Sequence, residues 1–223
     1  MQHFLHPLQQ IPHLRTAFVE RIADVPTAVD RDEAMRRLRP HHTAVIESLG
    51  FSSSHWWRAE QVHGAEIGLA GVDDTIIAAD GLPVIAGVDG LITQQEGLAL
   101  SIYVADCGVI WLADPTSSVM GLLHSGKKGT EANILGRAVR MMQENFGTRP
   151  ENLIAVLGPC IRPPHYEVDF ASTIADQARD AGIRHYHDAK TCTASDLPRF
   201  YSYRKELGHT GRMMAVIGSI PPL

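Results

Sequence analysis

Three residues that lie far apart in the sequence are candidate ligands of one metal ion. They are His63, Cys107 and His124, and a glycine follows each within two residues, so the backbone can turn sharply there and a substrate can approach. Two imidazoles and one thiolate suit zinc, and three protein ligands leave the fourth tetrahedral position open, which is typical of catalytic sites. Spacing alone does not separate this prediction from a buried thiol and two ordinary histidines.

The segment HSGKKGT, residues 124–130, is a candidate phosphate-binding loop. Backbone amides of a glycine-rich loop that opens a helix bind anions, and lysines add positive charge. The spacing is not that of a Walker A loop. The predicted phosphate-binding residues are Gly126, Lys127, Lys128 and Gly129, and the alternative is a solvated basic turn that caps a helix.

Four further side chains are candidates for catalysis. Asp89 and Asp106 are the carboxylates nearest the three ligands in sequence, and each can orient a metal-bound histidine or act as a general base. Gln61 lies two residues before His63 and, in a strand, would face the same side. Cys160 is a nucleophile if neighbouring positive charge lowers the pKa of its thiol. The alternatives are turn residues for the carboxylates and a packed structural thiol for Cys160.

The elements that must position these residues can be predicted from apolar periodicity. We expect a helix over 30–49 that Pro40 interrupts or kinks, short strands within 65–79, and a long buried strand over 98–113 that breaks near Asp106. A second buried strand, 119–123, ends at His124. A loop over 125–129 follows, and Thr130 is the expected helix N-cap.

Helices and strands alternate through the second half of the sequence. The expected elements are a helix that ends at Gly147, a strand over 153–157, a helix over 170–181, a helix over 196–207 and a final strand over 213–217. This alternation predicts an α/β fold, with helices covering the sheet. Cys107, His124 and Cys160 lie in or just after buried apolar runs and are expected to converge at one edge of a sheet.

Composition limits the classes of function. The chain has 223 residues, 44% of them apolar and 20% charged, and a net charge of −5, which argues against a nucleic-acid partner. Three widely spaced cysteines favour a reducing compartment. No apolar run is long enough to span a membrane and no signal peptide is visible, so a cytoplasmic protein of one domain, residues 1–223, is expected.

Six motifs, taken in order, resemble those of the laccase-domain family, also called the YfiH-like or polyphenol-oxidase family. They are QVHG at 61–64, DGLIT at 89–93, ADC at 105–107 followed by LADP at 112–115, HSGKKG at 124–129, GPCI with HYEVD at 158–169, and SYRKELGHTGR at 202–212. The resemblance covers roughly residues 55–218. It implies a mixed sheet between helical layers and one zinc ion on His63, Cys107 and His124.

The resemblance also implies an activity. Members of the family were first described as copper-dependent laccases, and better characterised relatives are purine nucleoside phosphorylases that cleave adenosine, inosine or guanosine with phosphate. Some also deaminate adenosine, and a bacterial branch is associated with peptidoglycan editing. We therefore expect a zinc enzyme whose partners are a nucleoside and phosphate. The alternatives are a copper oxidase at the same ligands and a non-catalytic, zinc-stabilised factor in cell-wall editing. The sequence leaves the oligomeric state open.

The chain departs from the family pattern at two places. The family commonly has HAGWRG where this chain has HSGKKG, so Lys127 replaces a tryptophan and Lys128 replaces an arginine. Lysine binds phosphate as a point charge, whereas arginine binds it as a planar fork, and the lost tryptophan removes a stacking surface for a base. The GGVS-like segment of many relatives, which helps to build the phosphate and nucleoside pocket, is not visible in 18–29.

Overall fold

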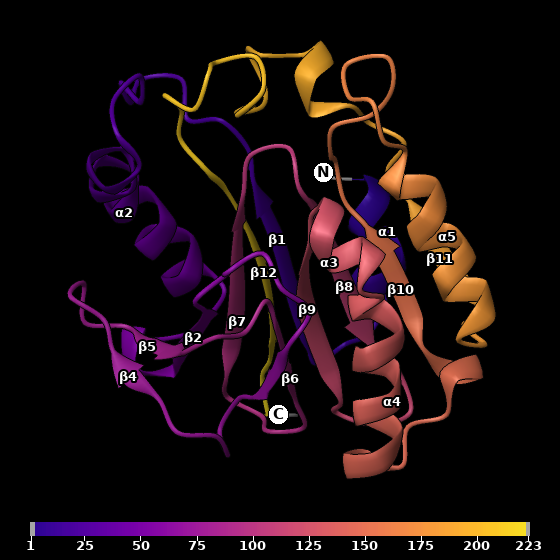
Figure 1. Cartoon of the computed structure of the whole chain (residues 1–223). Coiled ribbons are helices and arrows are strands. Elements are labelled where there is room, and N and C mark those ends of the chain that lie inside the picture. Colours follow the sequence, from indigo (N-terminus) through magenta and orange to yellow (C-terminus); the bar gives the residue numbers. More distant parts are fainter. Residues whose placement is uncertain (1–2, 222–223) are drawn as a thin grey trace.

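Two mixed six-stranded sheets face each other and form the centre of the protein (Figure 1). The computed structural model describes residues 3–221. The first sheet has the order β1 (Leu14–Val19), β12 (Met213–Ser219), β7 (Ala99–Val104), β2 (Trp56–Ala59), β5 (Pro83–Ile85), β4 (Ile76–Ile77). The second has the order β11 (His185–Asp188), β10 (Ile154–Leu157), β8 (Gly108–Ala113), β9 (Met120–Ser125), β6 (Gly90–Thr93), β3 (Ile67–Leu69).

Successive side chains of the central strands pack alternately into two different hydrophobic cores, one on each face of the sheet. In β8, Val109 and Trp111 pack into the core between the sheets, whereas Ile110 and Leu112 pack into the core beneath the helices. Because successive side chains in a strand point to opposite faces, a strand buried on both faces becomes a continuous apolar run. The dense run over 98–113 is therefore two such strands, β7 and β8, separated by 105–107, as predicted.

Helices cover the two outer faces, so the fold has four layers (Figure 1). Helix α2 (Arg31–Ser48) begins at its N-cap Asp30, contains Pro40, and packs Ile46 with Trp56 and Met214 of the first sheet. Helices α4 (Ile134–Phe146) and α5 (Phe170–Asp180) cover the second sheet. Two short helices, α1 (His6–Gln9) and α3 (Lys127–Glu131), complete the set of α-helices in the described part of the chain. The predicted fold class, mixed sheet layers flanked by helices, is confirmed.

Two predicted elements are wrong. The segment 125–129 is not a loop capped by Thr130, since β9 runs through Ser125 and α3 begins directly after Gly126. Asn133, with a positive φ, instead caps α4 by accepting a hydrogen bond from the backbone N–H of Gly136. Among residues 3–221, no helix has the length and apolar character needed to cross a membrane.

The second error is the helix predicted over 196–207. That segment forms turns, because Ser202 and the backbone N–H of Arg204 donate to the buried Asp106 carboxylate and Leu207 has a positive φ of 53°. The predicted strands over 119–123, 153–157 and 213–217 and the helix over 170–181 are confirmed within one or two residues at nearly every end. Strands β1, β5 and β11 are absent from the predictions.

Three connections carry the chain from the first sheet to the second at one end of the structure. They join β2 to β3, β5 to β6, and β7 to β8. His63 lies in the first, Asp89 in the second and Cys107 in the third, while His124 lies in β9 beside β6 and β8. Residues far apart in the sequence meet because these crossings are adjacent.

We expect the contact between the two sheets to dominate stability. Trp111 is fully buried, donates from its indole N–H to the carbonyl oxygen of Val216 at 2.9 Å, and packs against Phe4 and Phe18. Trp111→Ala should lower the free energy of unfolding by about 3–5 kcal/mol, measured by urea denaturation. The half-buried Trp57 provides the control, and an equal loss in Trp57→Ala would contradict this role.

Candidate metal centre

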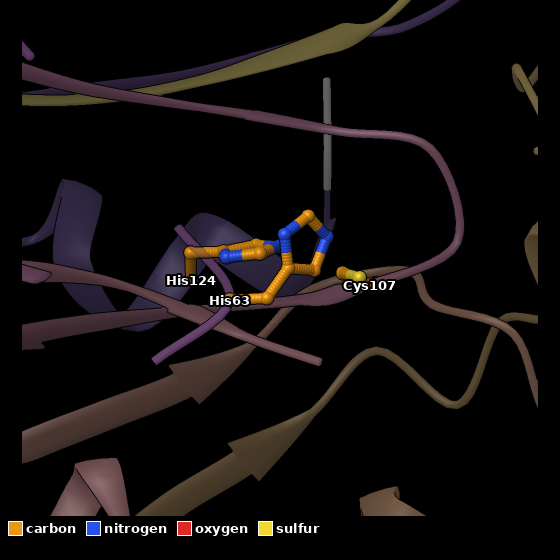
Figure 2. Close-up of side chains that lie close together, drawn as sticks. All are labelled: His63, Cys107 and His124. Carbon is orange, nitrogen blue, oxygen red and sulfur yellow. The ribbon is translucent and has the colours of Figure 1, made fainter. Parts of the chain in front are cut away.

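His63, Cys107 and His124 bring their donor atoms together, all within 4.8 Å of one another. The rings of His63 and His124 meet edge to face, with centroids 4.9 Å apart and an interplanar angle of 84°, and the Cys107 sulfur lies beside them (Figure 2). His124 is buried, Cys107 is half-buried and His63 is exposed. The three donors can therefore hold one metal ion at a site that opens to solvent on the His63 side.

The Asp89 carboxylate holds two of these ligands in place. One oxygen accepts from the His63 backbone N–H at 2.9 Å and lies 2.7 Å from Nδ1 of His124, and the other accepts from the N–H groups of Val62 and Gly64. Because a carboxylate accepts, His124 donates from Nδ1, and its Nε2 is left to face the metal. Asp89 is fully buried and does not line the cavity, so it orients ligands and does not meet a substrate.

The charges of the three side chains are coupled. Burial opposes ionisation of Cys107, but hydrogen bonds from His124 and His63 outweigh it and lower the thiol pKa to about 6. Burial also opposes protonation of His124, but Asp89 and Cys107 outweigh it and raise the imidazole pKa to about 9. Burial opposes ionisation of Asp89 as well, yet His124 and the backbone N–H groups keep its pKa below the ordinary value. Near neutral pH the metal-free site therefore holds a thiolate beside an imidazolium.

Asp106 connects the metal site to the C-terminal part of the chain. Its carboxylate accepts from Thr193 Oγ1 at 2.6 Å, from Ser202 Oγ at 3.0 Å and from the Arg204 N–H at 2.8 Å, and its carbonyl accepts from the Ile161 N–H. These contacts hold Asp106 at a φ of 84°, a costly backbone conformation for a residue with a side chain. Asp106 fixes the position of Cys107, the next residue.

The side-chain amide of Gln61 forms hydrogen bonds with the backbone of Tyr103. The amide donates to the carbonyl of Tyr103 at 2.7 Å and accepts from the Tyr103 N–H at 2.8 Å. Gln61 and His63 both have positive φ, at 64° and 62°. The pairing with Tyr103 thus anchors the start of the loop that carries His63.

The glycines of the predicted phosphate loop are needed for close packing. A Cβ on Gly126 would lie 2.8 Å from the Cys107 sulfur, and one on Gly129 would lie 2.8 Å from the carbonyl oxygen of Gly64. Neither glycine lines the cavity. Their part in binding phosphate stays a prediction. A side chain at either position would collide with Cys107 or with the loop that carries His63, so both positions need glycine.

A cavity of about 660 Å³ opens in front of the three donors. Of the predicted site residues it is lined by Gln61, His63, Asp106, Cys107, His124 and Lys127, whereas Asp89, Lys128 and Cys160 lie outside it. Cys160 is fully buried, and burial raises the pKa of its thiol to about 12. Cys160 therefore does not face the cavity, and its predicted role as a catalytic nucleophile there stays a prediction.

The cavity contains basic and aromatic residues that the sequence did not predict as part of the site. Arg31, Arg204 and Arg212 are the basic residues, and Tyr103, Tyr166, Phe170 and Tyr203 are the aromatic ones. Arg31 and Arg212 form no ion pair with a carboxylate in the described part of the chain. Burial and the nearby Arg31 lower the pKa of Arg212. The motif SYRKELGHTGR contains three of these residues and was a signal for them, whereas nothing in the sequence marks Arg31.

Sheet topology and ligand set together define a four-layer fold with a metal site where the chain crosses between its sheets. The chain belongs to the family described as multi-copper polyphenol oxidoreductase laccase, which matches residues 23–172 and 165–220. The predicted family is thereby confirmed.

Curated relatives match the chain in sequence, and solved structures match it in fold. The chain is 32% identical to a purine nucleoside phosphorylase of Deinococcus radiodurans, over 95% of this chain and 90% of that protein. It is 30% identical to the purine nucleoside phosphorylase YlmD of Geobacillus stearothermophilus, over 78% of this chain and 76% of that protein. The crystal structure of YlmD from Geobacillus stearothermophilus superposes with a TM-score of 0.80 at 24% identity, over 95% of this chain and 93% of that one. For the hypothetical protein YfiH of Bacillus licheniformis the TM-score is 0.81 at 22% identity, over 92% of both chains.

Asp89→Asn should weaken metal binding without unfolding the protein. The amide cannot accept from every group that the carboxylate serves, so His124 and the loop of His63 lose their orientation. We expect the affinity for Zn²⁺ to fall about 10- to 100-fold, measured by competition with a chromophoric chelator. Asp114→Asn is the matched control, because Asp114 is also buried but accepts only within its own turn, from Thr116. Equal losses in the two variants would contradict the orienting role.

Metal binding should release protons in a defined pH pattern. With pKa values of about 6 for Cys107 and about 9 for His124, the thiol is already ionised near pH 7.5 and the imidazole still carries its proton. Binding of Zn²⁺ should then release about one proton per ion, and affinity should fall steeply below pH 6 as Cys107 protonates. Calorimetric titration in buffers of different ionisation enthalpy measures the release, and a value near zero at pH 7.5 would contradict the charge state.

Proposed function

We propose that this protein is a zinc-dependent purine nucleoside phosphorylase, which cleaves a nucleoside with phosphate to give a free base and ribose 1-phosphate. The observation that carries the proposal is a single cavity that is lined both by the metal-ligand set and by two arginines without a carboxylate partner among the described residues. The names of the two curated relatives described above support the same activity. A metal-ligand set and positively charged side chains in one cavity suit a reaction that transfers ribose from a base to phosphate.

The donor set is suited to zinc. Two imidazoles and a thiolate match its preferences, and zinc bound by three protein ligands has a fourth position for water or substrate and supplies Lewis acidity there. The protein's own part is to hold Nε2 of His124 towards the metal through Asp89 and to keep Cys107 ionised. Substrate enters from the exposed side of His63.

Phosphate is held, in this proposal, by Lys127, Arg31 and Arg212. All three line the cavity, and the two arginines have no carboxylate partner among the described residues. Arg212 is half-buried and Arg31 is exposed. A half-buried guanidinium without a counter-ion favours a bound anion, because the anion replaces the interactions with water that burial removes. Phosphate binding is thus shared among the first residues of α2 and α3 and the residue before β12, and Lys128 has a lesser part than the sequence suggested.

Tyr166, Phe170 and Tyr203 supply the surface on which a purine base would stack. A flat aromatic base gains from contact with aromatic rings and with arginine. The rings of Tyr166 and Phe170 already meet edge to face, 6.0 Å apart, and Arg204 lies over Tyr166. This surface compensates for the tryptophan that the HSGKKG loop lacks.

Copper-dependent oxidation is the alternative that the family description suggests. Multicopper oxidation needs several metal sites rich in histidine. Within residues 3–221, one group of three or more histidine, cysteine or acidic residues could hold a metal, and it has three ligands. The donor set therefore favours one zinc ion over several copper ions.

The activity can be tested directly. Protein loaded with zinc should convert adenosine, inosine or guanosine to the free base and ribose 1-phosphate only when phosphate is present, as followed by chromatography. Release of inosine from adenosine would show the additional deaminase activity. Intact nucleosides across the panel, with one zinc per chain by metal analysis, would overturn the proposal and favour the non-catalytic role. Several coppers per chain with phenol oxidation would favour the oxidase.

Adjacent lysines on α3 offer a matched pair for the phosphate site. Lys127 lines the cavity and Lys128 does not, although both side chains are exposed. Lys127→Ala should raise the KM for phosphate about 10-fold or more, in line with the loss of one charge-assisted hydrogen bond worth about 1.5–3 kcal/mol. Lys128→Ala should change it by less than about 2-fold. A larger effect at Lys128 would show that phosphate binds on the outer side of the helix.

A further inference from the structure

Cys160 and Cys192, which lie apart from the three metal ligands, are direct partners in a parallel pairing of two segments. The Cys160 N–H donates to the carbonyl of Thr191, and the Thr193 N–H donates to the carbonyl of Cys160, both at 3.2 Å. Paired segments lie about 4.8 Å apart and directly paired side chains share a face of the sheet. That separation falls within the Cα range of about 4.4–6.8 Å that a disulfide spans.

The two thiols differ in access and in neighbours. Cys160 is fully buried in the core beneath the helices, and burial raises its pKa to about 12. Cys192 is half-buried, and its sulfur lies 3.4 Å from Nδ1 of His165 and 3.9 Å from the carbonyl oxygen of Arg162. His165 is within reach to accept the proton of Cys192. Only Cys192 combines solvent access with an adjacent proton acceptor.

We propose that Cys192 is a peroxide-reactive thiol and that Cys160 resolves its oxidised form as an intrachain disulfide. The Cys192 sulfur attacks one oxygen of hydrogen peroxide, so an S–O bond forms and the O–O bond breaks. The proton taken up by His165 passes to the leaving hydroxide, which becomes water. The Cys160 sulfur then attacks the Cys192 sulfur, the S–O bond breaks, and a second water leaves with the Cys160 proton. Two thiols are oxidised to one disulfide, and one peroxide is reduced to two waters.

The disulfide would act on the segment that carries the metal ligand Cys107. Ile161, next to Cys160, donates from its N–H to the Asp106 carbonyl at 2.8 Å, and Thr193, next to Cys192, donates to the Asp106 carboxylate at 2.6 Å. A covalent bond between the two cysteines therefore joins the two segments that hold Asp106, the residue before Cys107. A change in the oxidation state of the two cysteines would therefore act on Asp106, which is adjacent to Cys107 in the sequence.

The experiment uses the full chain, incubated with zinc and treated with low concentrations of hydrogen peroxide. The protein is then denatured in an alkylating reagent and digested with trypsin without reduction. Each cysteine falls on a separate peptide: 59–127 carries Cys107, 141–179 carries Cys160 and 191–199 carries Cys192. Mass spectrometry therefore identifies which thiols react and which become joined.

We expect 141–179 to be joined to 191–199, and dithiothreitol to separate them. Cys160→Ser should leave Cys192 as a sulfenic acid that dimedone traps, and Cys192→Ser should leave Cys160 reduced. His165→Ala should slow the reaction of Cys192 with peroxide several-fold, because the imidazole that accepts the thiol proton is lost. The proposal fails if peroxide leaves both peptides reduced, or if 59–127 is the peptide that becomes linked. It fails equally if Cys160 reacts at the same rate without Cys192.

Discussion

The buried carboxylate of Asp89 is the interaction on which the metal site depends. A charge with no exposed surface is costly unless hydrogen bonds and an opposite charge compensate for it, and here three consecutive backbone N–H groups and the imidazole of His124 do so. The same contacts determine the conformation of the loop that carries His63. Asp89, in the connection from β5 to β6, thus orients His63 and His124, which belong to two other elements. Its buried charge is tolerated only because these hydrogen-bond partners are in place.

The backbone around the site is strained, and the strain is confined to the crossings between the sheets. Six non-glycine residues in the described chain have positive φ, and four of them, Gln61, His63, Asp106 and Leu207, line the cavity. Each such residue costs about 1–3 kcal/mol. Side-chain hydrogen bonds from Gln61 to Tyr103 and from three segments to Asp106 offset that cost. A rigid scaffold of two sheets can hold ligands in this way, whereas a flexible loop cannot.

The parts of the site that could be predicted are those with a local signature. His63, Cys107 and His124 combine suitable side chains with adjacent glycines, and the strands before Cys107 and up to His124 are continuous apolar runs. The segment 196–207 was mistaken for a helix because its periodicity is helical, while its conformation is set by Asp106, about a hundred residues earlier in the chain. Arg31 has no local signature at all, since it enters the cavity only through the packing of α2 against the first sheet.

The three cysteines show how position determines the chemistry of one residue type. Beside two imidazoles, Cys107 has a pKa of about 6 and is a candidate metal ligand. In an apolar core, Cys160 has a pKa of about 12 and keeps its proton near neutral pH. Cys192 is half-buried and lies next to His165. Of the three environments, only that of Cys107 was indicated by the sequence, through the order of the motifs that contain the three ligands. Those of the other two arise from a pairing between segments some thirty residues apart, 158–161 and 191–193, which no local pattern encodes. Because both segments also hold Asp106, the metal ligand and the thiol pair share one supporting residue, so their chemistry is coupled through the backbone.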